Sequence, residues 1–134
     1  VRFYNSSKDT NPTATAMSIR SLKGPVVLLA GGQDRGSDFA ELAPVLRERV
    51  KALVAIGETR RKLAAAAEAA GVRHIRVIEH EGSAEATLER AVREADALAE
   101  PGDTVLLSPA CASWDMFASF EVRGRIFKEA AHIL

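Results

Sequence analysis

The sequence predicts an α/β domain of Rossmann-like, three-layer type, with a mostly parallel sheet and helices on both of its faces. Short apolar runs of strand length alternate with longer stretches of helical periodicity, the pattern of strand–helix–strand units. The central runs are apolar at every position, which is typical of strands buried on both faces. With 134 residues the chain suits one hydrophobic core, so we expect a single domain over residues 1–134.

The clearest expected strand is Val26–Ala30, five apolar residues that run directly into Gly31 and Gly32. Three further runs have the same character, and the polar–aromatic start of the chain is consistent with an edge strand. These expected strands cover residues 51–57, 74–78, 104–108 and, at the edge, 1–4.

The helical stretches carry recognisable ends. A first helix is expected to begin at a cap on Thr10 or Asn11, with Pro12 in its first turn, and to end near Leu22. The second has Ser37 or Asp38 as its cap, and its apolar face is expected to hold Phe39, Leu42, Leu46 and Val50. The others are expected over residues 59–70, stopping at the C-cap signal Gly71, over 83–99, and over 116–133, where Gly124 is a candidate for a break.

The composition of the chain argues against several classes of partner. Acidic and basic residues balance to a net charge of zero, which argues against a nucleic-acid partner. No apolar run approaches the roughly 20 residues that span a bilayer, so we expect no membrane partner. The single cysteine, Cys111, fits a reducing compartment, and a cytoplasmic location is expected. The three histidines have no metal-ligand spacing, so no metal site is expected.

Ligands of parallel α/β sheets gather at the carboxyl ends of the strands, which directs attention to three loops. Residues 30–37 combine paired glycines with Arg35, whose planar fork suits a carboxylate or phosphate; the alternative is a tight turn with a solvated arginine. Residues 108–115 are mostly small, and the alternative there is a plain connection in which Trp114 packs on the core. Residues 5–11 are polar and include Lys8, and the alternative is a solvated loop leading into a helix cap.

Taken together, the three loops resemble one family. Residues 3–12 have the form Phe-Tyr-Asn-x-Ser-Lys-x-Thr-Asn-Pro, and residues 30–36 have the form Ala-Gly-Gly-x-Asp-Arg-Gly. Residues 107–117 read Leu-Ser-Pro-Ala-Cys-Ala-Ser-Trp-Asp-Met-Phe. In this order they are similar to the C-terminal domain of the UDP-N-acetylmuramoylalanine–D-glutamate ligases, members of the Mur ligase family. The third motif is the most specific, because it separates these enzymes from other Mur ligases and from folylpolyglutamate synthase.

The resemblance implies a fragment of a three-domain enzyme, which also agrees with a chain that opens on Val1 rather than methionine. In such enzymes one domain holds the uridine nucleotide, the central domain holds ATP and Mg²⁺, and the C-terminal domain brings the amino acid. ATP phosphorylates the alanyl carboxylate of UDP-N-acetylmuramoyl-L-alanine, and the amine of D-glutamate attacks the acyl phosphate. No ATP-binding Gly-Lys-Thr loop is present in these 134 residues, so the chain alone is expected to be inactive.

The resemblance also assigns roles to residues. Thr10 and Arg35 correspond to donors for one carboxylate of D-glutamate, and Ser113 and the backbone amide of Phe120 to donors for the other. Lys8 corresponds to a lysine near the reacting centre, with Ser7 and Trp114 close to the site.

Two positions depart from the family pattern. Ser6 stands where relatives carry an aspartate that reaches the ATP ribose, which puts the ATP-facing role of this loop in question. Asp9 stands where relatives carry alanine, and an acid beside Lys8 and Thr10 is expected to weaken anion binding. These departures keep a second interpretation open, a stand-alone module that binds an amino acid or nucleotide without chemistry. A third interpretation, a ligase for L-glutamate on a folate, is disfavoured by the motif at residues 107–117.

Overall fold

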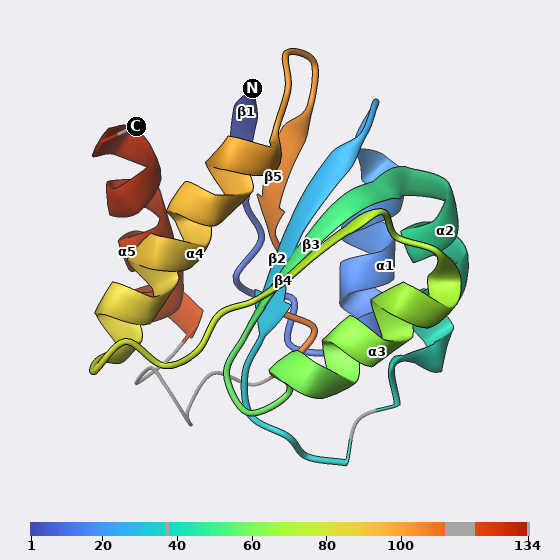
Figure 1. Cartoon of the computed structure of the whole chain (residues 1–134), viewed down its shortest axis with the longest axis horizontal. Helices are drawn as coiled ribbons and strands as arrows, with labels where there is room; N and C mark the ends of the chain where they lie inside the picture. The colour runs from blue at the N-terminus through green and yellow to red at the C-terminus, as the bar shows by residue number, and fades with distance from the viewer. Residues whose placement is uncertain (37, 112–119, 134) are drawn as a thin grey trace.

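The computed structural model describes residues 1–36, 38–111 and 120–133. Within them the chain alternates strand and helix from β1 to α5 (Figure 1). The strands are β1 (Arg2–Asn5), β2 (Val26–Gly31), β3 (Val50–Ile56), β4 (His74–Val77) and β5 (Thr104–Leu107). The helices are α1 (Pro12–Ser21), the 3-10 turn η1 (Phe39–Leu42), α2 (Ala43–Arg49), α3 (Arg60–Ala70), α4 (Ala84–Leu98) and α5 (Phe120–Ile133).

The five strands form one sheet in the order β1-β5-β2-β3-β4, and every pairing in it is parallel. Helices α1, α2 and α3 lie on one face and α4 and α5 on the other (Figure 1). The predicted three-layer, Rossmann-like fold is therefore confirmed. Because all strands are parallel, the loops that follow β1, β2 and β5 emerge at the same edge of the sheet.

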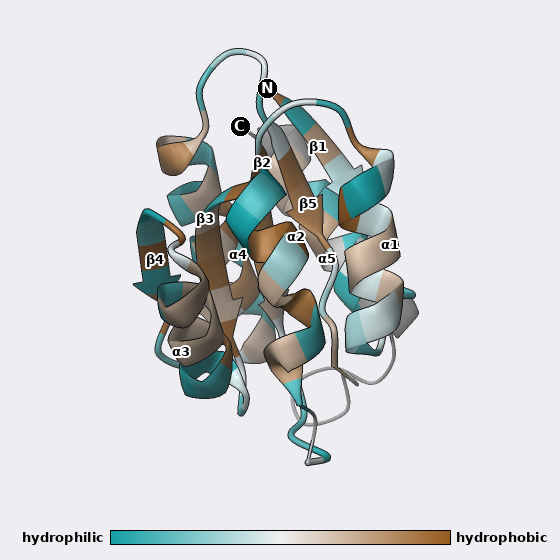
Figure 2. Cartoon of the chain, turned by 90° about the vertical axis from the view of Figure 1, so that its right-hand side faces the viewer, coloured by the Kyte–Doolittle hydropathy of each residue, from teal (hydrophilic) through white to brown (hydrophobic). Residues whose placement is uncertain are grey.

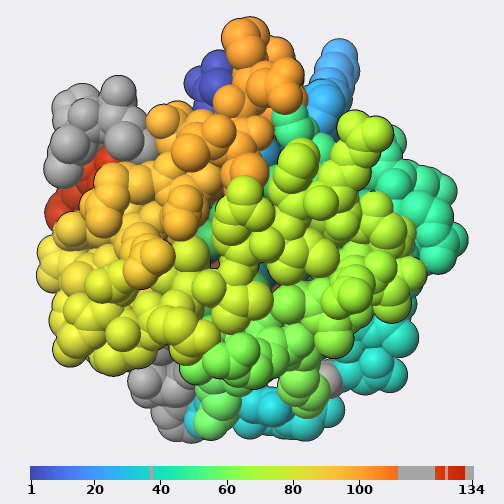
Figure 3. Space-filling view, in the orientation of Figure 1, coloured from blue at the N-terminus to red at the C-terminus, as the bar shows by residue number. Residues whose placement is uncertain are grey.

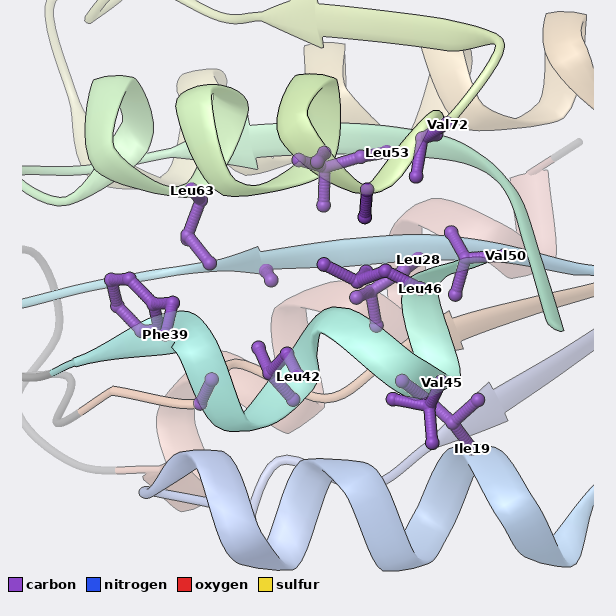
Figure 4. Close-up of a cluster of buried hydrophobic side chains, with 14 of the residues drawn as sticks. Ile19, Leu28, Phe39, Leu42, Val45, Leu46, Val50, Leu53, Leu63 and Val72 are labelled. Atoms are coloured by element: carbon purple, nitrogen blue, oxygen red, sulfur yellow. The ribbon is translucent and has the colours of Figure 1, made fainter. Parts of the chain in front are cut away.

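Two apolar clusters hold the layers together, one on each face of the sheet. Strand residues alternate between them, so that Leu28 and Leu53 pack toward α1–α3 whereas Leu29 and Val54 pack toward α4 and α5. Figure 4 shows the first cluster, where Phe39, Leu42 and Leu46 of η1 and α2 lie against the strands. The hydrophobic colour in Figure 2 concentrates accordingly on the central strands.

The helix ends follow the capping signals in the sequence. Asn11 accepts a hydrogen bond from the Ala14 amide at 2.9 Å and caps α1, and Asp38 accepts one from the Ala40 amide at 2.9 Å and caps η1. Gly71 ends α3 with φ +88°, the left-handed conformation that favours glycine. In the space-filling view, residues of α3, β4 and α4 make up much of the face toward the viewer (Figure 3).

Two helix predictions are wrong. The stretch after Asp38 is divided into η1 and α2, and Val50 belongs to β3, because its backbone is extended (φ −99°, ψ 114°) and it pairs with Val26. Helix α5 is not broken at Gly124 but continues through it. The predicted start of that helix at Met116 falls outside the described residues.

Candidate functional site

Backbone hydrogen bonds join the three loops at the carboxyl edge of the sheet. The Ser6 amide donates to the Leu107 carbonyl at 2.7 Å, and the Ala110 amide donates to the Asp9 carbonyl at 3.0 Å. The Gly31 amide donates to the Pro109 carbonyl, also at 3.0 Å. The loop after β5 is thus tied to the loops after β1 and β2, and the sheet order places it between them.

The loop after β1 presents two predicted site residues to solvent. Lys8 and Thr10 are exposed, whereas Ser7 is buried. The Ser7 amide donates to Asn5 Oδ1 at 3.0 Å, and the Ser7 hydroxyl donates to the same oxygen. Ser7 therefore shapes the loop that carries Lys8, and its hydroxyl is directed at Asn5.

Asp9 directs its carboxylate into the molecule. Its side chain is buried, and Asp9 Oδ2 accepts hydrogen bonds from Ser18 Oγ at 2.5 Å and Ser108 Oγ at 2.7 Å. Ser108 Oγ also lies 2.8 Å from Thr15 Oγ1. The sequence led us to expect an acid beside Lys8 and Thr10. That expectation is wrong for the orientation of the side chain, because the two hydroxyls hold the carboxylate on the interior side of the loop.

Ser6 joins the same buried network. Its side chain is buried and its hydroxyl lies 3.1 Å from Ser18 Oγ. Since the single hydroxyl proton of Ser18 is donated to Asp9, Ser6 is the donor in this pair. Both departures from the family pattern therefore lie in one interior network.

The loop after β2 depends on a close backbone approach at Gly31. A Cβ atom at Gly31 would lie 1.8 Å from the Ile56 carbonyl oxygen, and its φ of +134° also excludes other residues. Farther along, the Asp34 amide donates to Glu58 Oε1 at 2.5 Å, and Lys62 Nζ lies 3.1 Å from Asp34 Oδ1. Hydrogen bonding from the Gly36 amide, followed by that from Lys62, lowers the pKa of the Asp34 carboxyl.

Arg35 extends from this loop and is exposed. Its Nε donates to Gln33 Oε1 at 3.1 Å, which orients the guanidinium group. The geometry thus brings Lys8, Thr10 and Arg35 to one edge of the sheet. Ser113 and Trp114 fall outside the described residues, and Phe120 is the first described residue of α5.

The sequence of residues 1–111 matches a family model described as "Mur ligase, glutamate ligase domain". The chain belongs to this family. The resemblance inferred from the three loops is confirmed for the Mur ligase domain, and the matched range includes Lys8, Thr10 and Arg35.

Several similar proteins are named UDP-N-acetylmuramoylalanine–D-glutamate ligase. One from Limosilactobacillus fermentum is 52% identical over 99% of the chain, and one from Bacillus cytotoxicus is 49% identical over 99%. One from a Thermoanaerobacter species is 50% identical over 97%. The Mur ligase domain described here spans 28% of the length of each of these relatives.

Sequence reasoning missed the residues that hold the Mur ligase loops in place. Thr59 bridges two of them, because its hydroxyl lies 3.1 Å from the Gly32 amide and 3.3 Å from Cys111 Sγ. Arg123 is fully buried, and its Nη2 donates to the Ser7 carbonyl at 3.0 Å. In the sequence Thr59 stands at the start of an expected helix, and Arg123 lies within the expected last helix with no role assigned to it. The sequence signal for Thr59 was its place shortly after Gly57, at the end of an expected strand. The signal for Arg123 was its place directly before Gly124.

Within residues 1–36, 38–111 and 120–133, no three His, Cys, Asp or Glu side chains gather as a metal site. None of the helices described there is long and apolar enough to cross a membrane.

Proposed function

We propose that this chain is the amino-acid-binding domain of an ATP-dependent ligase that joins D-glutamate to UDP-N-acetylmuramoyl-L-alanine in peptidoglycan precursor synthesis. The observation that carries the proposal is the identity of 49–52% over nearly the whole chain with proteins named for this reaction. It is supported by the exposure of Lys8, Thr10 and Arg35 on loops at one edge of the sheet.

D-Glutamate has two carboxylates, and both must be held if its amine is to meet the acyl donor in one orientation. The Arg35 guanidinium and the Thr10 hydroxyl are suited to one carboxylate, because a planar fork and a neutral donor complement its two oxygens. Ser113 and the Phe120 amide remain the proposed donors to the other. This assignment rests on the family motif and on the exposure of Thr10 and Arg35.

Lys8 is proposed to act on the reacting group. Its ammonium is exposed, and the Asp9 carboxylate beside it in sequence is directed into the interior. A positive charge at this place would stabilise the negative charge that develops on the oxygens of the phosphoryl and acyl groups during the reaction.

ATP with Mg²⁺ would supply the activation of the alanyl carboxylate. We propose that both are held mainly by other domains, because the 134 residues contain no Gly-x-x-x-x-Gly-Lys-[Ser/Thr] loop. A cytoplasmic location follows from the proposed substrates. The second candidate, a binding module without chemistry, is favoured only by the changes at Ser6 and Asp9. Their interior hydrogen bonds give both residues a role in the fold that is compatible with a ligase.

The test uses the full-length protein that contains this chain. We expect ATP-dependent joining of D-glutamate, but not L-glutamate, to UDP-N-acetylmuramoyl-L-alanine, measured as product by chromatography and as ADP release. No product with either isomer from a folded protein would contradict the proposal and favour the binding module.

The carboxylate assignment has its own test in the same protein. Arg35→Ala is expected to raise KM for D-glutamate by about 10- to 100-fold, because it removes a charge-assisted hydrogen bond of roughly 1.5–3 kcal/mol. Arg73→Ala is the matched control, since Arg73 is exposed and directly precedes β4, at the opposite edge of the sheet. Equal KM values for Arg35→Ala and the unmodified protein would remove Arg35 from the site.

A further inference from the structure

The start of helix α3 holds the loop that carries Arg35. The two segments lie side by side at the carboxyl edge of the sheet (Figure 1). The Thr59 amide donates to the Gly32 carbonyl at 3.1 Å, and the Gly32 amide donates to Thr59 Oγ1, also at 3.1 Å. The loop is therefore fixed at Gly32, before the chain reaches Arg35.

Asp34, the residue directly before Arg35, is held through both its main chain and its side chain. Its amide donates to Glu58 Oε1 at 2.5 Å. Lys62 Nζ donates to the two carboxylate oxygens of Asp34, at 3.1 Å to Oδ1 and 3.3 Å to Oδ2. These partners are 24 and 28 residues away along the chain. Asp34 is thus attached to the start of α3 by one hydrogen bond and one ion pair.

The Asp34 carboxylate also fixes the residue that follows Arg35. Asp34 Oδ1 accepts a hydrogen bond from the Gly36 amide at 2.9 Å, and Gly36 has a φ of +76°. Arg35 Nε donates to Gln33 Oε1 at 3.1 Å. Both neighbours of Arg35 are therefore fixed, and the direction of its side chain depends on a turn that the Asp34 carboxylate closes.

Lys62 also balances the negative charge of Asp34 beside the arginine. An unbalanced carboxylate next to Arg35 would repel a carboxylate ligand and compete with it for the guanidinium group. The pair is partly exposed, with 47% of the Lys62 side chain and 30% of the Asp34 side chain accessible to solvent. Because solvent screens such a pair, its direct effect on ligand binding is only about two- to fivefold.

We propose that Lys62 is a positioning residue for D-glutamate: through Asp34 it holds the Arg35 guanidinium where a carboxylate of the substrate binds. This role rests on the proposed function, in which Arg35 binds one of the two carboxylates. Lys62 belongs to α3 and lies outside the three loop motifs. Since Lys62 acts through Asp34 and Arg35, its loss should weaken the binding of D-glutamate and leave the chemical step unchanged.

The experiment measures the steady-state kinetics of the full-length protein that contains this chain. Lys62→Met removes the charge and keeps much of the side-chain length. It is expected to raise KM for D-glutamate about three- to tenfold, because displacement of Arg35 adds to the small effect of the ion pair. The kcat and the KM for ATP should stay within about twofold of the unmodified protein. Lys62→Arg, which can still pair with Asp34, should restore KM. Lys23→Met is the matched control and should change none of these constants, since Lys23 is an exposed lysine between α1 and β2, at the opposite edge of the sheet.

A double replacement separates the positioning role from a general effect on the fold. Asp34→Asn should raise KM for D-glutamate in the unmodified protein but add little in the Lys62→Met protein, because the pair is already broken there. Equal effects of Asp34→Asn in both proteins would overturn the proposal. So would an unchanged KM in Lys62→Met, or a fall in kcat without a change in KM. No product from the unmodified protein would contradict the proposed function itself, and the role of Lys62 with it.

Discussion

The carboxylate of Asp9 lies beneath the loop that carries Lys8 and Thr10, where the hydroxyls of Ser18 and Ser108 donate to it. The sequence could suggest only that an acid stands next to Lys8. Its orientation depends on Ser18 and Ser108, which are 9 and 99 residues away along the chain. Neighbouring residues on an irregular loop share no fixed period, so their directions cannot be predicted as they can in a helix or strand.

Asp9→Ala is expected to destabilise the chain by about 1–3 kcal/mol, because buried hydroxyls lose a charged acceptor. Urea unfolding followed by circular dichroism measures the change. Glu68→Gln is the control, since Glu68 is exposed on α3 and should change stability by no more than about 0.5 kcal/mol. A stability equal to that of the unmodified chain would show that the network does not depend on the carboxylate.

At the scale of elements, the order of strands and helices could be predicted because apolar periodicity and capping residues act locally. Asn11 and Asp38 cap the starts of α1 and η1, and Gly71 caps the end of α3, as the sequence indicates. Val50 could not be assigned, because an apolar residue at a helix–strand junction fits both periods and its pairing with Val26 decides the matter. Gly124 was similarly ambiguous, since its role depends on contacts with the distant β1 loop.

The replacement Gly124→Ala has two opposing effects on the stability of the fold. Alanine in a helix interior gains about 0.5–1 kcal/mol over glycine from backbone propensity. Its Cβ would lie 2.8 Å from Asn5 Nδ2 and Ser7 Oγ, and overpacking of this kind costs about 1–3 kcal/mol. We expect a net loss of stability, larger for Gly124→Ser, by urea unfolding. A stabilised Gly124→Ala protein would show that α5 can move away from the loop without cost.

Lys51 and Asp103 connect β3 to the start of β5. Their side chains are 2.7 Å apart, and Asp103 is only 4% exposed. Burial opposes ionisation of Asp103, but hydrogen bonds from Lys51 and the Glu100 amide outweigh it and lower the pKa of the carboxyl. A lowered folded-state pKa means that this stabilisation is present above the ordinary value of 3.8 and is lost as pH falls below it.

Asp103→Asn should therefore reduce the loss of stability on acidification in that pH range, while lowering stability at neutral pH by about 1.5–3 kcal/mol. Urea midpoints measured across the acid range provide the comparison. Glu100→Gln is the matched control, because Glu100 is 77% exposed at 3.3 Å from Lys51 and should change the profile little. Parallel acid profiles for Asp103→Asn and the unmodified chain would contradict the assignment.

At the scale of the whole molecule, the proposed reaction needs groups that this chain does not supply. The chain spans 28% of the relatives it matches, and its 134 residues contain no nucleotide-binding Gly-Lys-Thr loop. Holding two reactants in one orientation accounts for roughly 7–11 kcal/mol of the barrier in well-oriented cases. Under the proposed function this domain orients only the amine, so by itself it cannot provide that advantage.

We therefore expect the 134-residue chain to release no ADP from ATP when it is mixed with D-glutamate and UDP-N-acetylmuramoyl-L-alanine. The full-length protein under the same conditions is the positive control, and both are compared by coupled ADP release and by product chromatography. Product from the chain alone would mean that its own residues activate the alanyl carboxylate. In that case Lys8, Arg125 and Lys128, the cations that line one groove, would be the first residues to replace.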